Sequence, residues 1–400
     1  MDEYQAFNLD YFPENILIDV LSYLSIRELI KAGRVCKRWN RLVKDQRLWR
    51  FVDLTAWKGV TSRILWLLLR HYLGRGLRCL RLRGLLLYAR GGTFLSESWL
   101  RALPTKCPRL NKLYLVQADL RSLHSCQLLP PSLQVLELRG CELPLEFFNQ
   151  TSPSQERAEA TSSVGGQQQG RHRKGKGLGS PSGIGIERLV LNNVPSFTDH
   201  HLKSLTSWER LSRLKLRDTF RVTANGIMKC AAKDGLSRLK FLEISIHGRR
   251  GYPLQFASLG LSAGWLGLEE LCLGGKEVRI GLLNFNVSRL ENLKCLCLRA
   301  CKLHEMQIVR NCRLLSRLSR LEFLHVTFQQ IPPAVEGEGG GSGEEQDNEE
   351  AAGVDDSNDE NNTVDMNDPI PSLCRSLADL LPTCTLVFTN CSVQISAYYR

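Results

Sequence analysis

The sequence lacks the long apolar run and the leader that membrane-inserted or secreted proteins carry. Its longest apolar stretch, Ile64 to Leu73, is interrupted by Arg70 and His71 and falls short of the roughly 20 residues that cross a membrane. The N-terminus is acidic, without the basic and then apolar pattern of a secretory signal. We therefore expect a cytoplasmic or nuclear protein with no membrane partner. In such a compartment its 14 cysteines should be small buried residues, not a disulfide framework.

Aromatic residues are also scarce, whereas leucine is abundant. The 400 residues include 14 Phe, 9 Tyr and 7 Trp but 69 Leu, and 43% of the chain is hydrophobic. This much apolar material excludes disorder along the whole chain. An excess of one residue type over such a length indicates that an internal repeat should be tested first.

The repeat is the string L-x-x-L-x-L, with Ile, Val, Thr or Phe replacing Leu in places. It begins at Leu77, Leu110, Leu133, Ile186, Leu211, Leu239, Leu268, Leu293, Leu321 and Thr383. Seven of the nine intervals between these starts lie between 23 and 33 residues, close to the period of a leucine-rich repeat. Leucines two apart point to the same side of a strand, and no single unit buries its own apolar face, so the units must stack. We predict an α/β fold in which about ten repeats form a curved solenoid over residues 77–400, with the strands on the concave side.

Two segments of biased composition account for the long intervals. Residues 150–183 are rich in Gly, Ser and Gln and carry a basic cluster, and residues 333–369 are rich in Gly, Glu, Asp and Asn. Both are predicted to be disordered insertions between repeats. Residues 336–368 hold 13 acidic side chains and no Lys or Arg, so the net charge of +12 conceals +25 on the rest of the chain. The acidic segment either solvates the chain or folds back onto a basic face.

The first fifty residues have helical periodicity instead of strand periodicity. Residues 9–52 predict three short helices: the first begins at Pro13, the second has a capping box of Ser25 and Glu28, and the third carries Trp39. Residues 53–76 predict a helical linker to the repeats. Three helices this short cannot bury their apolar surface among themselves, so part of that surface should meet a partner.

Three signatures in this segment are specific. They are Phe12-Pro13 followed by ILIDVLSYL, the run VCKRW that ends at Trp39, and Leu48-Trp49. The segment resembles an F-box, and with the repeats that follow it the chain is similar to the F-box/leucine-rich-repeat proteins. This resemblance implies a non-catalytic substrate-recognition subunit of an SCF-type ubiquitin ligase, without cofactor or metal. Its F-box would bind a Skp-type adaptor and, through it, a cullin-RING ligase. The motif match places adaptor contacts at Pro13, Ile16, Leu17, Leu21, Leu24, Leu29, Val35 and Trp39.

The residues between the leucines should line the concave face and capture a protein substrate. Eight of the fifteen such positions in the first five repeats are basic and one is acidic, whereas the later repeats offer Phe241 and Phe323. We predict that the first half binds an acidic or phosphorylated segment and the second half an apolar one. The alternative is that the basic residues only solvate an exposed sheet. The predicted substrate contacts are Arg81, Arg83, Lys112, Tyr114, Arg139, Arg188, Arg213, Lys215, Arg217, Phe241, Arg299 and Phe323.

A different class of function is a leucine-rich-repeat scaffold without a ligase role, which binds RNA through the same basic face. We favour the receptor and do not expect nucleic acid as its partner. Copurification separates the two, because adaptor and cullin indicate the receptor and nuclease-sensitive partners indicate the scaffold. A crowded set of Cys295, Cys297, Cys301, His304 and Cys312 has zinc-binding residue types. The repeat phase turns Cys301 away from the other strand cysteines, so no metal site is predicted.

Overall fold

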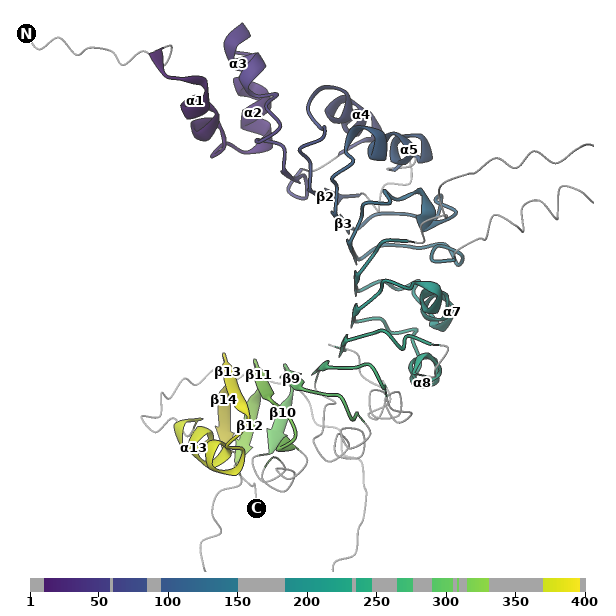
Figure 1. The fold of residues 1–400 in the computed structure, drawn as a ribbon, viewed down its shortest axis with the longest axis vertical. Helices are drawn as coiled ribbons and strands as arrows, with labels where there is room; N and C mark the ends of the chain where they lie inside the picture. Colours follow the sequence, from purple (N-terminus) through teal and green to yellow (C-terminus); the bar gives the residue numbers. More distant parts are fainter. Residues whose placement is uncertain are drawn as a thin grey trace, which may run out of the picture.

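The computed structural model describes residues 11–57, 60–84, 95–149, 184–231, 235–246, 265–275, 290–304, 308, 315–330 and 370–395. These parts form a crescent, with the N-terminal helices at one tip and the last strands at the other (Figure 1). The insertions predicted at 150–183 and 333–369 lie outside the described residues. No helix in the described ranges is both long and apolar enough to span a lipid bilayer.

Three short helices precede the repeats, as predicted: α1 (Glu14–Leu21), α2 (Ile26–Ala32) and α3 (Lys37–Leu42). Pro13 is the N-cap of α1. The capping box of α2 is present, because the Glu28 amide donates to Ser25 Oγ at 3.4 Å and Glu28 Oε2 accepts from the Ser25 amide at 2.8 Å. These two reciprocal bonds satisfy amides that the helix itself cannot, so the start of α2 is set by the local sequence.

An eleven-stranded parallel sheet lines the concave side of the crescent. The strands follow the order of the chain and pair in register, so that Leu80, Leu113 and Leu136 fall in one row. Leu113 and Leu115 are each 1% exposed, as the L-x-L pattern predicts. Ten of these strands correspond to the ten predicted repeats. The strands are β1 (Phe51–Asp53), β2 (Cys79–Arg83), β3 (Lys112–Val116), β4 (Val135–Arg139), β5 (Arg188–Asn192), β6 (Arg213–Arg217), β7 (Phe241–Ser245), β8 (Glu270–Gly274), β9 (Cys295–Arg299), β11 (Arg320–Leu324) and β13 (Thr385–Thr389).

The sheet begins earlier than the predicted domain boundary. Phe51 of β1 pairs with Cys79 of β2, so residues assigned to the F-box and the linker already belong to the sheet. The linker does contain a helix, α4 (Ser62–His71), which is capped by Thr61. The sequence pattern missed β1 because Trp49 and Val52 replace the first two leucines of the string: Val52 pairs with Leu80, and Trp49, Val52 and Leu54 are all buried.

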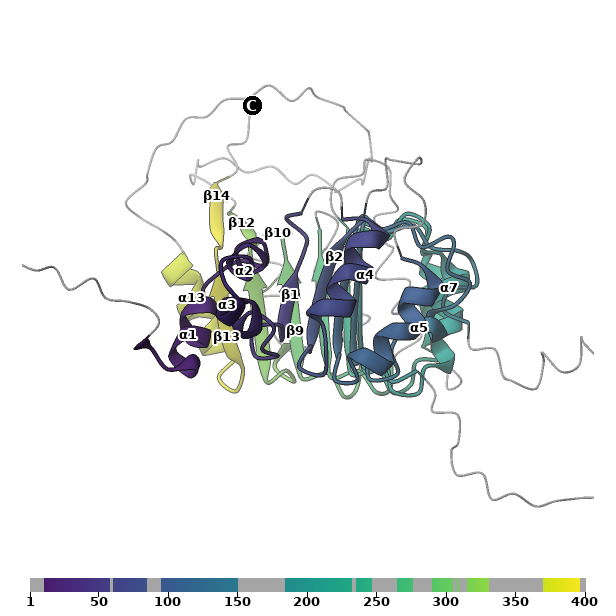
Figure 2. The ribbon, with the colours of Figure 1, turned by 90° about the horizontal axis from the view of Figure 1, so that it is seen from above.

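The convex side carries the segments that return from one strand to the next. Figure 2 shows α4, α5 and α7 on the same side of the strands. Thr198 caps α7, and Leu202 and Leu205 behind it are buried, as predicted. A second parallel sheet of three short strands lies at the far tip. The remaining elements are α5 (Glu97–Lys106), η2 (Cys126–Leu128), α7 (Asp199–Ser204), η3 (Leu205–Ser207), α8 (Ala224–Cys230), α13 (Ile370–Leu380), β10 (Lys302–His304), β12 (Thr327–Gln330) and β14 (Ser392–Ile395).

The ninth repeat lies three residues earlier than predicted. Leu321 pairs with Leu296, so the string starts at Leu318 and Phe323 takes the place of its last leucine. Both frames fit the sequence, because Leu321 can be the first or the second leucine of the string. Phe323 is therefore 1% exposed and stacks on Phe388 with ring centroids 5.0 Å apart. Its predicted role as a substrate contact is wrong. The residues that face outward on this strand are Arg320, Glu322 and Leu324.

A corner residue with a left-handed backbone follows several strands of the large sheet. Its φ is +50° at Gln117, +59° at Gly140, +49° at Asn193 and +53° at Asp218. The amide of this corner donates to the last carbonyl of the next strand, as from Gln117 to Arg139 at 2.7 Å. Gly, Asn and Asp tolerate this conformation better than other residues do. The leucine period carries no information about this position.

Cysteine takes the place after the corner in some repeats. Cys141 and Cys301 are buried there, and Cys141 Sγ donates to the Leu115 carbonyl at 3.3 Å. Seven of the thirteen described cysteines are buried and five are half-buried, so the predicted burial holds for about half of them. Cys36 is exposed instead, because it is the N-cap of α3 and its Sγ accepts from the Trp39 amide at 3.4 Å.

Candidate functional site

The N-terminal helices present a stripe of exposed apolar side chains. Ile16, Val20 and Tyr23 recur at intervals of four and three residues, which places them on one side of α1 and the turn that ends it. Val20 is 55% exposed and Tyr23 is 89% exposed. Pro13 continues the same line and is also exposed. We call Pro13, Ile16, Val20 and Tyr23 the α1 stripe. An exposed apolar row of this kind indicates a surface that binds another protein.

Three of the predicted adaptor contacts are exposed, two are half-buried and three are buried. The exposed residues are Pro13, Ile16 and Val35, and the half-buried ones are Leu24 and Trp39, which pack against the core. The buried residues are Leu17, Leu21 and Leu29, at 3%, 3% and 2% exposure. These three belong to the core of the segment, which corrects their predicted role as direct contacts. Helical periodicity could not separate the two sides of α1, because apolar residues occur on both.

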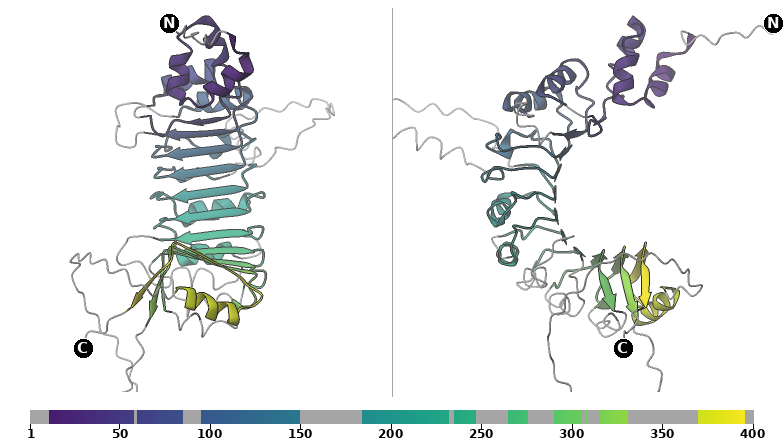
Figure 3. Two further views of the ribbon diagram at one scale, coloured as in Figure 1. Left: turned by 90° about the vertical axis from the view of Figure 1, so that its left-hand side faces the viewer. Right: turned by 180° about the vertical axis from the view of Figure 1, so that it is seen from behind.

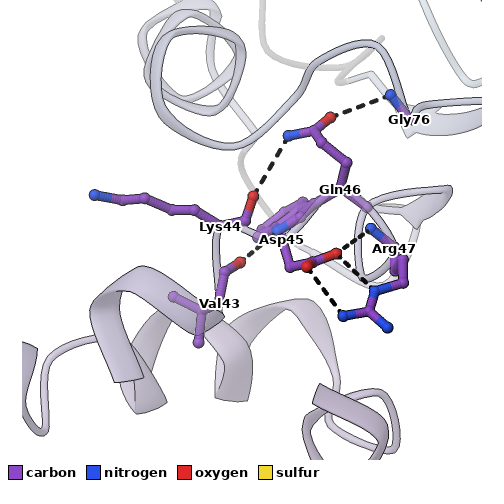
Figure 4. Close-up of polar contacts among 7 residues, drawn as sticks. Val43, Lys44, Asp45, Gln46, Arg47 and Gly76 are labelled. Carbon is purple, nitrogen blue, oxygen red and sulfur yellow. Dashed lines mark hydrogen bonds and ion pairs between the residues drawn. The ribbon is translucent and has the colours of Figure 1, made fainter. Parts of the chain in front are cut away.

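A junction of polar and aromatic side chains fixes these helices to the first repeat (Figure 4). Gln46 Nε2 donates to the Tyr72 carbonyl at 3.3 Å, and Gln46 Oε1 accepts from the Gly76 amide at 3.1 Å. Trp49 is fully buried beside it and donates its indole N–H to the Val43 carbonyl at 2.6 Å. The rings of Trp49 and Tyr72 pack with centroids 4.7 Å apart. The orientation of the helices against the sheet is thus set by the buried packing of Trp49 on Tyr72 and by the Gln46 hydrogen bonds at the surface.

Gly76 is required for the close approach at this junction. A Cβ on Gly76 would lie 2.5 Å from the Gln46 backbone oxygen, whereas a Cβ on Gly74 would meet the amide end of the Gln46 side chain at 2.6 Å. We expect Gly76→Ala to lower the free energy of unfolding by about 1–3 kcal/mol, because backbone atoms cannot move without opening the junction. Gly74→Ala is the matched control and should cost less, because the Gln46 side chain can rotate away and exchange its two solvent-exposed hydrogen bonds for water, whereas the backbone cannot move. Chemical denaturation measures both variants, and equal losses would contradict this assignment.

Strands β2 to β5 present cations on the concave face, which Figure 3 (left) shows from the front. Arg81 stacks on the ring of Tyr114 at 4.7 Å and lies 3.5 Å from Asp53. The other predicted contacts in this region, except Arg83, make no ion pair or hydrogen bond through their side chains with another described residue. They are Lys112, Arg139 and Arg188, all of them exposed. The basic first half of the face is therefore present on these four strands.

The cations of the next strand, β6, are paired within the chain. Arg213 donates two hydrogen bonds to the Glu270 carboxylate, at 3.3 and 2.8 Å. Its guanidinium lies over the half-buried ring of Phe241 at 4.4 Å. Arg213 and Phe241 are thus engaged within the chain, and their contact with substrate stays a prediction. The sequence could not show this pairing, because Arg213 and Glu270 are brought together only by the stacking of β6, β7 and β8.

Glu243 is a buried carboxylate in the middle of the concave sheet, with a side chain only 2% exposed. It pairs with Lys215 at 3.1 Å, Arg217 at 2.5 Å and Arg299 at 3.5 Å. Burial raises the pKa of Glu243, but the hydrogen bond from Arg217 and the charges of Lys215 and Arg217 outweigh it, so the pKa lies below its usual value. Three more of the predicted substrate contacts are thus engaged in a structural cluster, which we call the Glu243 cluster.

Charged side chains and thiols, with few aromatic anchors, line the second half of the face. A hollow of about 490 Å³ is lined by the Glu243 cluster and other charged residues, together with Cys272, Cys295 and Cys297 and the apolar Phe241 and Leu324. Within the described part of the chain, no group of three or more His, Cys, Asp or Glu side chains is arranged to hold a metal ion. The second half of the concave face, which was predicted to bind an apolar segment, thus offers only small apolar patches.

Sequence comparison with known proteins agrees with this architecture. Residues 9–55 match the F-box-like family. The chain is 35% identical over 287 residues to F-box/LRR-repeat protein 12 of Homo sapiens, which covers 66% of this chain and 79% of the relative. It is 33% identical over 285 residues to the Bos taurus protein of the same name, with the same coverage. A crystal structure of a TLR13-ssRNA13 complex is similar with a TM-score of 0.38 and 14% identity, over 83% of this chain and 34% of that one.

A helical F-box joined to a parallel leucine-rich-repeat sheet makes this an F-box protein with repeats. The chain belongs to the F-box/LRR-repeat protein family, where it is similar to the mammalian F-box/LRR-repeat protein 12.

Proposed function

We propose that the chain is the substrate-recognition subunit of an SCF-type ubiquitin ligase. The α1 stripe and Val35 dock a Skp-type adaptor, which connects the chain to a cullin-RING scaffold, and the concave sheet captures a protein substrate. One combination carries the proposal: a single chain holds an exposed apolar F-box stripe and a long open sheet face, joined by a buried junction at Trp49. Membership of the F-box/LRR-repeat family supports it.

A subunit of this kind positions the substrate, and other subunits carry out the covalent chemistry. Holding a substrate beside a ubiquitin-conjugating partner raises its effective concentration there. Buried Trp49 and the hydrogen bonds of Gln46 keep the F-box and the sheet in one orientation. The fold therefore sets the distance between the adaptor and the bound substrate.

The charges on the concave face favour an acidic or phosphorylated segment of a cytoplasmic or nuclear protein. Lys112, Arg139 and Arg188 are exposed cations on neighbouring strands, whereas each cation of β6 is paired with Glu243 or Glu270. The Glu243 cluster still carries a net charge of +2, because one carboxylate serves three cations, so the attraction weakens beyond β5 without ending there. Because such attraction is screened by salt, association with an acidic partner should slow as ionic strength rises.

Affinity purification of the full chain, with and without inhibitors of the proteasome and of cullin activation, tests the proposed function. We expect adaptor and cullin in every eluate, and substrate proteins that accumulate when the inhibitors are present. An eluate without adaptor and cullin, whose partners are lost on nuclease treatment and at high salt, would instead support a leucine-rich-repeat scaffold that binds RNA.

A further inference from the structure

A cavity of about 640 Å³ opens where strands β2 to β6 end. Its lining consists mainly of the last residues of these strands and of the corner residues that follow them. Those that matter here are Arg83, Gln117, Arg139, Gly140, Asn193 and Asp218. We call this cavity the Gly140 pocket, and it lies beside the concave face that the proposed function assigns to substrate.

The pocket exists because one corner residue has no side chain. Gln117, Gly140 and Asn193 occupy equivalent corners of three neighbouring repeats, and all three have a positive φ. A Cβ built on Gly140 would touch only Gln117 Cγ, at 3.5 Å, which is an ordinary contact distance. The space that a side chain would fill between Gln117 and Asn193 is therefore open.

Two positively charged hydrogen-bond donors, Arg83 and Arg139, line this space. Arg83 Nε donates to Gln117 Oε1 at 3.0 Å, which positions the guanidinium and leaves its terminal N–H groups for other acceptors. Among the described residues, neither Arg83 nor Arg139 pairs with a carboxylate, in contrast to Arg217 on β6. Arg83 and Arg139 are two strands apart, roughly 10 Å between Cα atoms, so both side chains can reach one group between them. Side-chain amides, including that of Asn193, supply further donors.

Asp218 also lines the pocket, where it interacts with another part of the chain. The only cations among the described residues of the lining are Arg83 and Arg139, so the pocket offers paired donors for one acidic group and not for a continuous acidic run. Guanidinium groups bind phosphate and carboxylate oxygens through paired hydrogen bonds. We propose that the Gly140 pocket binds a single oxyanion, either a phosphoryl group or a terminal carboxylate, carried on an extended segment of the substrate. The assignment of that segment to a substrate rests on the proposed function.

Fluorescence anisotropy of the full chain with four pools of labelled degenerate peptides tests this. One amidated pool has a central phosphothreonine, a second has threonine there, and a third has three consecutive glutamates. The fourth has threonine at the centre and a free C-terminal carboxylate. We expect either the phosphothreonine pool or the free-carboxylate pool to bind roughly tenfold tighter than the amidated threonine pool. The pool that binds more tightly identifies the source of the oxyanion. The glutamate pool should bind more weakly than that pool.

Two variants remove the pocket in different ways. Gly140→Asn fills the space without changing charge, and asparagine adopts the same backbone conformation at Asn193 and Asn390. Arg83→Ala with Arg139→Ala removes the two cations and leaves the backbone unchanged. Both should abolish the tenfold preference. The matched control is Lys106→Ala with Arg109→Ala, which removes two exposed cations at and just after the end of α5, outside the pocket lining and the concave strands, and should keep the preference.

Equal binding of all four pools would overturn the proposed oxyanion site. An equal loss of the preference in the control variant would overturn it too. Adaptor capture is measured on the same proteins. Wild-type protein that captures adaptor but shows no preference refutes the pocket alone, whereas failure to capture adaptor refutes the proposed function.

Discussion

Replacing Ile16 and Val20 by glutamate is expected to abolish capture of a Skp-type adaptor while the F-box stays folded. Both side chains lie on the α1 stripe and are 42% and 55% exposed, so the fold does not depend on them. In a complex each would be an apolar anchor, and a carboxylate in its place would have to lose its water without gaining a partner. We expect the affinity for purified adaptor to fall by more than about 100-fold, measured by calorimetry on the full chain.

Two further variants make this result interpretable. Leu145→Glu places the same charge on a leucine of the repeats that is also 55% exposed, and adaptor affinity should not change. Leu17→Asp places a charge in the F-box core, where Leu17 is 3% exposed, and the segment should unfold. Ile16→Glu/Val20→Glu protein that keeps native circular dichroism and full adaptor affinity would remove the α1 stripe as the docking surface.

The F-box shows which structural features the spacing of apolar residues can predict and which it cannot. Local signals predicted its three helices, and the capping box of Ser25 and Glu28 is formed as expected. The spacing of apolar residues did not show that Leu17 is internal and Val20 external, because the choice depends on where α2 and α3 pack. That packing is decided by residues distant in the sequence. Sequence patterns therefore identify the docking module more reliably than its contact residues.

The repeats show a second limit. The leucine string predicted ten parallel strands and their concave placement, and it slipped by three residues only where Leu321 fits two frames. Counting the charged residues between the leucines also predicted a basic concave face. The structure corrects this count for β6, where the cations are paired with carboxylates. Arg217 and Glu243 are separated along the chain but adjacent across strands, so their neutralisation depends on register and burial. Charge counts alone could not distinguish a free cation on β4 from a paired one on β6.

Glu243→Gln should lower the free energy of unfolding by about 3 kcal/mol. Glutamine keeps the shape of the side chain but removes its charge, so Lys215, Arg217 and Arg299 lose their common partner and repel one another. These cations keep 25%, 26% and 32% of their side-chain surface in solvent. We therefore place the loss at the low end of the range for breaking a buried ion pair. Chemical denaturation of the full chain measures it.

A matched control separates burial from charge. Glu322 lies on the same concave face, pairs with Arg320 of its own strand at 2.5 Å and is 30% exposed. Glu322→Gln should cost less than about 1 kcal/mol, because solvent screens the pair. Similar losses for the two variants would show that burial of Glu243 is not what makes its cluster strong.

The Glu243 cluster should also make stability depend on acidic pH. Burial raises the pKa of Glu243, but Arg217 and Lys215 more than compensate, so its folded pKa lies below the unfolded value of about 4.3. The contribution of the carboxylate is therefore complete above about pH 4.3 and is lost as pH falls through the folded pKa. The difference in denaturation midpoint between wild type and Glu243→Gln should be constant from neutral pH to about pH 5 and shrink below about pH 4. It shrinks because a protonated Glu243 leaves the same three cations unneutralised. A difference that persists undiminished at about pH 3 would mean that the glutamine amide itself, not the lost charge, destabilises the variant.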